Sequence, residues 1–119
     1  MALSEEQLQE GVATVLRYRR LDCVWFHVPN GGHRHVATAA RLKRMGTRAG
    51  VADLIFLRGD QPSACIELKK KSGRQTESQK EFQADCEAKG IPYFIIKSDD
   101  QNDMNAKVLG TLKGLGIVK

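Results

Sequence analysis

Residues 64–69 read Ala-Cys-Ile-Glu-Leu-Lys and form the most informative segment of the sequence. Its composition predicts a β-strand, in which alternate side chains share a face. The apolar side chains at positions 64, 66 and 68 are expected to face a core, while Glu67 and Lys69 lie on the other face with Cys65. Charged groups in the middle of a sheet are costly unless they are paired or bind a ligand. The strand is therefore expected to carry either a Glu67–Lys69 salt bridge at a sheet edge or a functional site.

A second apolar run, Ala52–Leu57, precedes this strand, and residues 58–62 between them are typical of a turn. The two runs are expected to pair as a β-hairpin, which would bring Asp53 close to Glu67. Two carboxylates held together repel each other unless a cation lies between them. Mg²⁺ and Mn²⁺ prefer such oxygen ligands. The alternative is that Asp53 is an ordinary surface acid.

Four helices and two further strands are predicted around the hairpin. Ser4 with Gln7, and Thr76 with Gln79, form capping boxes that mark the starts of two helices. The predicted helices cover residues 5–20, 36–45, 77–89 and 103–113, and the further strands cover 24–28 and 93–97. The order α-β-α-β-β-α-β-α indicates an α/β fold, a single domain over residues 1–119 with a central mixed sheet flanked by helices. The aromatic residues of the strands are expected in the core: Trp25, Phe26, Tyr93 and Phe94.

The composition narrows the class of protein. The length of 119 residues is that of one domain, and 41% hydrophobic with 28% charged residues is ordinary for a globular chain. No window approaches the ~18 apolar residues of a membrane span, and the acidic first residues differ from a signal or transit peptide. Three widely spaced cysteines without a CxxC pair argue against a disulfide framework and a zinc knuckle. A cytoplasmic location is expected.

Positive charge is concentrated in one third of the chain. The net charge is +5, and residues 17–48 hold eight Lys or Arg against Asp22 alone. Seven of the eight are arginine, whose planar guanidinium suits phosphate oxygens. The cluster is either a phosphate-binding surface or a solvated basic face. The histidines of this region, His27, His33 and His35, lack the spacing of a zinc site, and the last two are expected to contact phosphate or solvent.

The pattern of Asp53 followed by Glu67-x-Lys69 on a hairpin resembles the signature of the PD-(D/E)xK nuclease superfamily. More narrowly, the sequence resembles the VRR-NUC family, over collinear stretches from about Ser4 to Ser98. In that family a proline usually stands where this chain has Ala52. The matching stretches are Ser4-Glu5-x-x-Leu8-Gln9, Val28-Pro29-Asn30-Gly31-Gly32, Gly46 with Gly50-Val51-x-Asp53-Leu54, Ile66-Glu67-Leu68-Lys69, and Gln79.

The resemblance implies a restriction-endonuclease-like fold and a metal site. Asp53 and Glu67 would hold Mg²⁺ or Mn²⁺, helped by a backbone carbonyl near Leu68. Glu5 would complete the site from the first helix, where it borders the apolar face that begins with Leu8. The alternative for Glu5 is a first-turn acid favoured by the helix dipole.

The resemblance also implies catalytic and DNA-binding roles. Lys69 would orient the attacking water or neutralise the phosphate, and Gln79 would reach one of them, unless Gln79 only caps the backbone of Thr76. Asn30, Gly31 and Gly32 would form a loop that contacts DNA, unless they are only a turn. The other candidates for DNA contact are basic, and half of them are expected to be merely solvated: Arg34, Arg41, Lys43, Arg44, Arg48, Lys70, Lys71 and Arg74.

The function that the resemblance implies is a metal-dependent, structure-specific DNA endonuclease that cleaves branched DNA such as Holliday junctions. The protein would act as a homodimer in a bacterial or phage-infected cell, without a small-molecule cofactor or a membrane partner. The last helix and Val36–Met45 are candidate dimer surfaces. The alternatives are a nicking, flap or restriction-type nuclease on the same site, a non-catalytic basic DNA-binding module, and a protein whose charge only solvates it.

Overall fold

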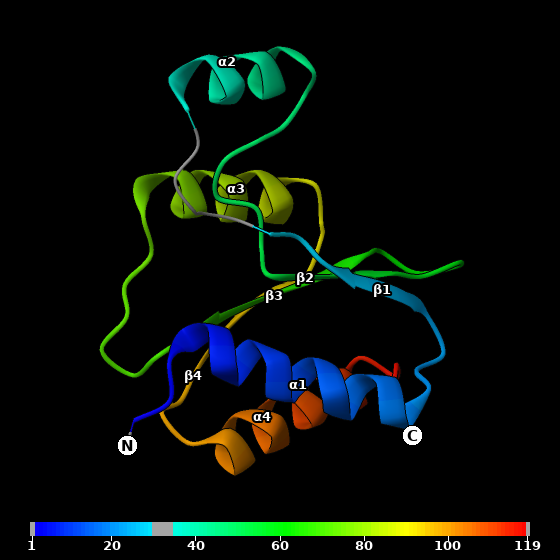
Figure 1. Ribbon diagram of the computed structural model, residues 1–119. Helices are drawn as coiled ribbons and strands as arrows, with labels where there is room; N and C mark the ends of the chain where they lie inside the picture. Colours follow the sequence, from blue (N-terminus) through cyan, green and yellow to red (C-terminus); the bar gives the residue numbers. More distant parts are fainter. Residues whose placement is uncertain (1, 30–34, 119) are drawn as a thin grey trace.

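The computed structural model describes residues 2–29 and 35–118. In these residues one mixed sheet contains, in spatial order, β1 (Val24–His27), β2 (Leu54–Leu57), β3 (Ala64–Lys69) and β4 (Tyr93–Lys97). β1 and β2 pair antiparallel, β2 and β3 pair antiparallel, and β3 and β4 run parallel. The predicted hairpin is confirmed, and so is the mixed α/β sheet (Figure 1). β2 begins later than predicted, so Asp53 lies just before the strand rather than inside it.

The described residues form the helices α1 (Glu5–Arg19), α2 (Val36–Arg44), α3 (Glu77–Ala88) and α4 (Gln101–Gly114). All but α2 cover the faces of the sheet. α1 and α4 pack together on one face, whereas α3 covers the opposite face (Figure 1). α4 begins two residues earlier than predicted because the side chain of Asp100 caps the N–H of Asp103. None of the helices in the described residues is long and apolar enough to cross a lipid bilayer.

The apolar core has two parts, one on each face of the sheet. The larger part joins α1 and α4 to the sheet and contains Leu8, Phe56 and Ile66, all without exposed surface. The smaller part lies under α3 and contains Ala52, Cys65 and Cys86, with Phe82 and Tyr93 packed against it. β3 is buried along its whole length because helices cover both of its faces. The prediction that Phe26 lies in the core is wrong. Phe26 is 43% exposed because β1 is an edge strand.

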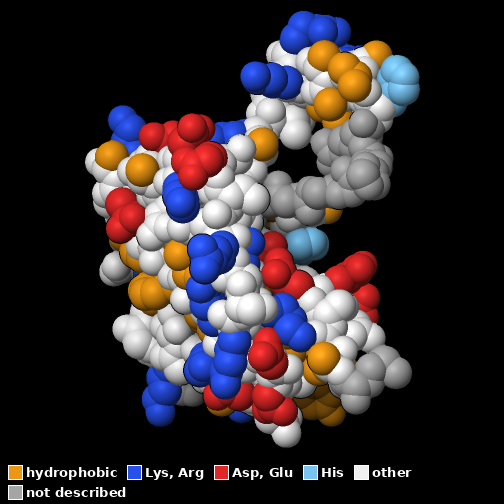
Figure 2. Space-filling model, turned by 90° about the vertical axis from the view of Figure 1, so that its left-hand side faces the viewer, with side chains coloured by type: hydrophobic (Ala, Val, Ile, Leu, Met, Phe, Trp, Pro, Cys, Tyr) orange, Lys and Arg blue, Asp and Glu red, His pale blue; other side chains and the backbone are white. Residues whose placement is uncertain are grey.

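α2 stands apart from the rest of the fold. It packs against no other described helix or strand, and none of its residues is buried. Figures 1 and 2 show it on a lobe that projects from the body. Val36 and Met45 at its two ends are 82% and 75% exposed. The side chain of His35 caps its first turn by accepting a hydrogen bond from the N–H of Ala37.

Candidate functional site

The register of the hairpin places Asp53 across from Glu67. Leu54 pairs with Ile66 in antiparallel register. Asp53, which precedes Leu54, therefore lies opposite Glu67, which follows Ile66. Side chains directly opposite each other in an antiparallel pair share a face of the sheet. Oδ2 of Asp53 accepts a hydrogen bond of 2.6 Å from the N–H of Leu68, which fixes the carboxylate against β3. The two carboxylates that the sequence analysis singled out are therefore brought together.

Two neighbouring segments hold the backbone of Asp53. Its carbonyl accepts the N–H of Val28 at 3.0 Å and lies 2.8 Å from Nδ1 of His27. Upstream, Gly50 has a φ of +80°, and a Cβ there would lie 2.3 Å from the carbonyl carbon of Ser78. The chain before Asp53 thus passes directly against the first turn of α3. His27 beside Asp53 was missed by the sequence analysis, because only the pairing of β1 with β2 places it there.

Glu67 is 1% exposed, and its two carboxylate oxygens have different surroundings. Oε1 accepts hydrogen bonds from the hydroxyl of Tyr93 at 2.6 Å and from Nε2 of Gln75 at 3.2 Å. Oε2 is buried and has no hydrogen-bond partner. A buried charged oxygen without a partner is costly, and a bound ion is one of the few explanations for it. The free oxygen of Glu67 is therefore a candidate ligand atom.

Burial raises the pKa of Asp53 from its ordinary value of 3.8 to about 6. The hydrogen bond from Leu68 opposes this rise, while the negative charges of Glu5 and Glu67 add to it. The electrostatic interaction with His27 lowers the pKa of Asp53, against the effect of the two acids. A divalent cation at this carboxylate would offset both the burial and the repulsion.

The donor set fits a hard divalent cation. Mg²⁺ is commonly held by one or two carboxylates and keeps several waters. The N–H of Leu68 points toward Asp53, and the carbonyl of a strand residue points to the same side as its N–H. Asp53, Glu67 and this carbonyl are thus available as oxygen ligands. No group of three His, Cys, Asp or Glu residues within the described ranges could hold a metal, so Glu5 is not brought into a ligand cluster with the other two carboxylates.

Lys69 is 7% exposed, and its strand position puts it on the same face as Glu67. The alternative of a Glu67–Lys69 salt bridge is not observed, because the ion pairs of the described residues all involve other side chains. An ammonium group in this position can interact with a phosphate or a water molecule at the carboxylates.

Gln79 forms the capping box predicted for it. Its Oε1 accepts the N–H of Thr76 at 2.8 Å, and Oγ1 of Thr76 accepts the N–H of Gln79 at 3.2 Å. The backbone N of Gln79 also lies against Gly50. The structure thus gives Gln79 a part in joining α3 to the segment before Asp53. A role toward water or phosphate stays a prediction.

Two of the predicted DNA contacts have structural partners. Arg48 forms an ion pair of 2.5 Å with Asp85, and its guanidinium lies 5.2 Å from the centre of the Phe82 ring. Lys70 donates to the carbonyl of Leu3 and lies 3.7 Å from Asp99. Four of the other candidates, with His33, lie outside the described residues: Asn30, Gly31, Gly32 and Arg34. The remaining candidates are exposed: Arg41, Lys43, Arg44, Lys71 and Arg74.

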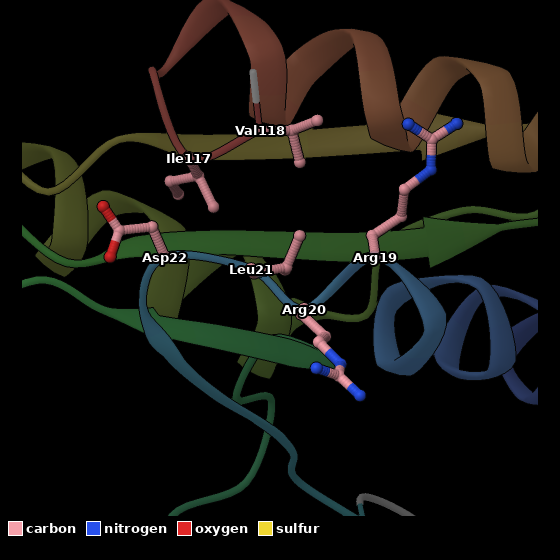
Figure 3. A pocket seen from close by; sticks show the side chains of 6 residues that line it. All are labelled: Arg19, Arg20, Leu21, Asp22, Ile117 and Val118. Carbon is pink, nitrogen blue, oxygen red and sulfur yellow. The ribbon is translucent and has the colours of Figure 1, made fainter.

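A cavity of about 500 Å³ lies elsewhere, at the end of α1. Its lining comes from Arg19, Arg20, Leu21, Asp22, Ile117 and Val118 (Figure 3). Glu5, whose negative charge raises the pKa of Asp53, is the first residue of α1, and Arg19 is the last. A helix of this length spans about 22 Å. In Figure 3 the guanidinium groups of Arg19 and Arg20 point in different directions. The cavity is therefore separate from the carboxylate site, and its two arginine side chains do not converge on a common ligand position.

Comparisons with known proteins support the fold. No protein-family model matches the sequence. No curated protein matches it either. A solved structure named "VRR_NUC domain protein" is similar over 95% of this chain and 91% of that chain, with a TM-score of 0.66 and 23% sequence identity. At this identity the likeness concerns the fold, and the predicted VRR-NUC fold is confirmed.

Proposed function

We propose that this chain, which has the fold of a VRR-NUC domain, is a metal-dependent nuclease that hydrolyses phosphodiester bonds of DNA. The observation that carries the proposal is the buried, unpartnered Oε2 of Glu67 on the strand beside Asp53. Repulsion and burial at this pair are unfavourable for a purely structural site, and a divalent cation would relieve both. Lys69 on the same strand adds a positive charge that no acidic side chain of the described residues neutralises.

Each residue of the site has a role in the proposed reaction. Asp53, Glu67 and the carbonyl of Leu68 would hold Mg²⁺ or Mn²⁺. When bound, such a cation supplies activation of a water molecule and stabilisation of charge on the phosphate. Lys69 orients the attacking water or stabilises the negative charge that develops on the phosphate oxygens. Lys69 lies in the central, fully buried strand β3, so little reorganisation of its backbone is needed as the charge develops.

The DNA-binding surface in this proposal includes α2. Its exposed cations can follow a phosphate backbone, and α2 itself contains no acid. Figure 2 shows Lys and Arg side chains at the far end of the lobe that carries α2 and on one of its sides. Lys71 and Arg74, in the loop after β3, can contribute further phosphate contacts.

The substrate is proposed to be branched DNA, recognised by shape. The described residues contain no separate unit for reading bases, so phosphate position and DNA geometry are left to provide specificity. Two copies of the chain would supply one site for each of two strands. Of the two candidate dimer surfaces, α2 is favoured because its apolar ends Val36 and Met45 are exposed. Three large apolar residues of α4 are instead buried within the chain: Met104, Val108 and Leu112.

The experiment that tests the proposal is cleavage of a labelled four-way junction, with linear duplex and single-stranded DNA as comparison substrates. Each is incubated with wild-type protein or Lys69→Met, in Mg²⁺, Mn²⁺ or EDTA. We expect cleavage of the junction by the wild type in either metal, none in EDTA and none by the variant. Cleavage of linear duplex alone would exclude branched DNA as the substrate but would still support the nuclease activity. Binding without cleavage in either metal would overturn the nuclease in favour of a DNA-binding module.

A further inference from the structure

Tyr93 is a residue of the site that the proposed reaction does not yet use. It begins β4, and its hydroxyl donates a hydrogen bond of 2.6 Å to Oε1 of Glu67. The ring is held at its edge by Phe82 of α3, with 6.0 Å between the ring centres. Two elements therefore set the position of the hydroxyl: the parallel pairing of β4 with β3 and the packing of α3.

Gln75 provides the second hydrogen bond to the same oxygen. Its Nε2 lies 3.2 Å from Oε1 of Glu67 and 2.9 Å from Oε1 of Gln83 on α3. The contact with Gln83 orients the amide so that its nitrogen faces the carboxylate. Donors from β4 and from the loop after β3 thus converge on Oε1, while no group of the described residues donates to Oε2.

We propose that Tyr93 is a positioning residue for Glu67: with Gln75 it holds Oε1, and it thereby reserves Oε2 for the divalent cation. This inference rests on the proposed function. A carboxylate held by one oxygen cannot rotate freely about its last bond, so less freedom is lost when a cation binds the other oxygen. Groups that hydrogen-bond to metal ligands typically change metal affinity by about 10–100-fold when removed.

The test is Tyr93→Phe, which removes the hydroxyl and keeps the ring that contacts Phe82. Binding of Mn²⁺ is measured directly from the electron paramagnetic resonance signal of the free ion, without DNA. We expect the Kd for Mn²⁺ to rise about 10-fold or more. Cleavage should fall at limiting Mn²⁺ and recover toward the wild-type rate at saturating Mn²⁺. The matched control is Tyr18→Phe, since Tyr18 is 91% exposed, and its Kd for Mn²⁺ should equal that of the wild type.

Two further variants separate positioning from a general effect on the fold. Gln75→Met removes the other donor to Oε1 and should weaken Mn²⁺ binding in the same direction, which keeps the test possible if Tyr93→Phe fails to fold. In a Glu67→Gln background, Tyr93→Phe should cause no additional loss of Mn²⁺ binding. A Kd within twofold of the wild type for Tyr93→Phe would overturn the inference alone, provided the wild type binds Mn²⁺ and cleaves DNA. A wild type that binds no Mn²⁺ would overturn both the inference and the proposed function.

Discussion

Replacing Asp53 with Asn should stabilise the protein in the absence of divalent metal while abolishing cleavage. The carboxylate of Asp53 is largely removed from water and lies near the negative charges of Glu5 and Glu67. Asn has nearly the same shape, and its amide oxygen can still accept the N–H of Leu68. The substitution therefore removes an unfavourable charge and keeps the hydrogen bond that fixes the side chain.

The pKa of Asp53 gives the size of this effect. Its rise from 3.8 to about 6 corresponds, at 1.36 kcal/mol per pKa unit, to about 3 kcal/mol. Because the pKa is raised on folding, the group contributes stability that is fully present below about pH 4 and lost as the pH rises through about 6. At pH 8 in EDTA, Asp53→Asn should therefore exceed the wild type in free energy of unfolding by about 2–3 kcal/mol.

Urea denaturation in EDTA at several pH values measures the difference. The wild type should lose stability relative to Asp53→Asn between about pH 4 and pH 7, and the gap should then remain constant. The matched control is Asp60→Asn in the exposed turn between β2 and β3, which changes the net charge equally and should follow the wild type. Added Mn²⁺ should stabilise the wild type and Asp60→Asn but not Asp53→Asn. The reasoning is refuted if Asp53→Asn is no more stable than the wild type at pH 8 in EDTA.

Three other variants test the site, the backbone and the DNA-binding surface. Lys69→Met should lower single-turnover cleavage by at least about 100-fold and leave the Tm unreduced, because no ion pair of the described residues is lost; a lowered Tm would contradict this. Gly50→Ala should lower the free energy of unfolding in urea by more than about 2 kcal/mol, because its Cβ would lie 2.3 Å from Ser78. Gly59→Ala, where a Cβ meets nothing within 4 Å, should change it little, and equal effects would refute the steric account. In the third variant, three cations of α2 are replaced together by Gln: Arg41, Lys43 and Arg44. Fluorescence anisotropy at several salt concentrations should then show weaker DNA binding, with an unchanged Tm. The slope of log K against log salt concentration should fall by about 0.9 per lost phosphate contact. An unchanged slope would exclude α2 from the DNA-binding surface.

The parts of the fold that depend on local signals could be predicted from the sequence. Alternation of apolar residues and an intervening turn define the β2–β3 hairpin, and the hairpin alone brings Asp53 to Glu67. Capping boxes set the starts of α1 and α3 at the predicted residues. These features need no knowledge of the rest of the chain, because each is determined by neighbours within about 15 residues.

Features that depend on distant segments were not predicted. Tyr93 reaches Glu67 only because β4 pairs parallel with β3 in one particular register, across 26 residues of sequence. The exposure of Phe26 follows from the place of β1 at the sheet edge, which the composition of the strand does not reveal. α2 has the pattern of a helix, yet no local signal shows that it packs against nothing else in the described chain.

Glu67 and Lys69 show why this part of β3 is better explained by function than by stability. They have opposite charges, share a face of one strand and are both buried, yet the described residues contain no ion pair between them. Two donors instead fix Glu67 by Oε1, and its Oε2 remains unpartnered. A strand selected for stability alone would pair these charges or replace them with apolar residues, which is often neutral or stabilising. Retaining both charges unpaired, beside an Asp whose pKa is raised, is the arrangement expected where the missing partners are a cation and a phosphate.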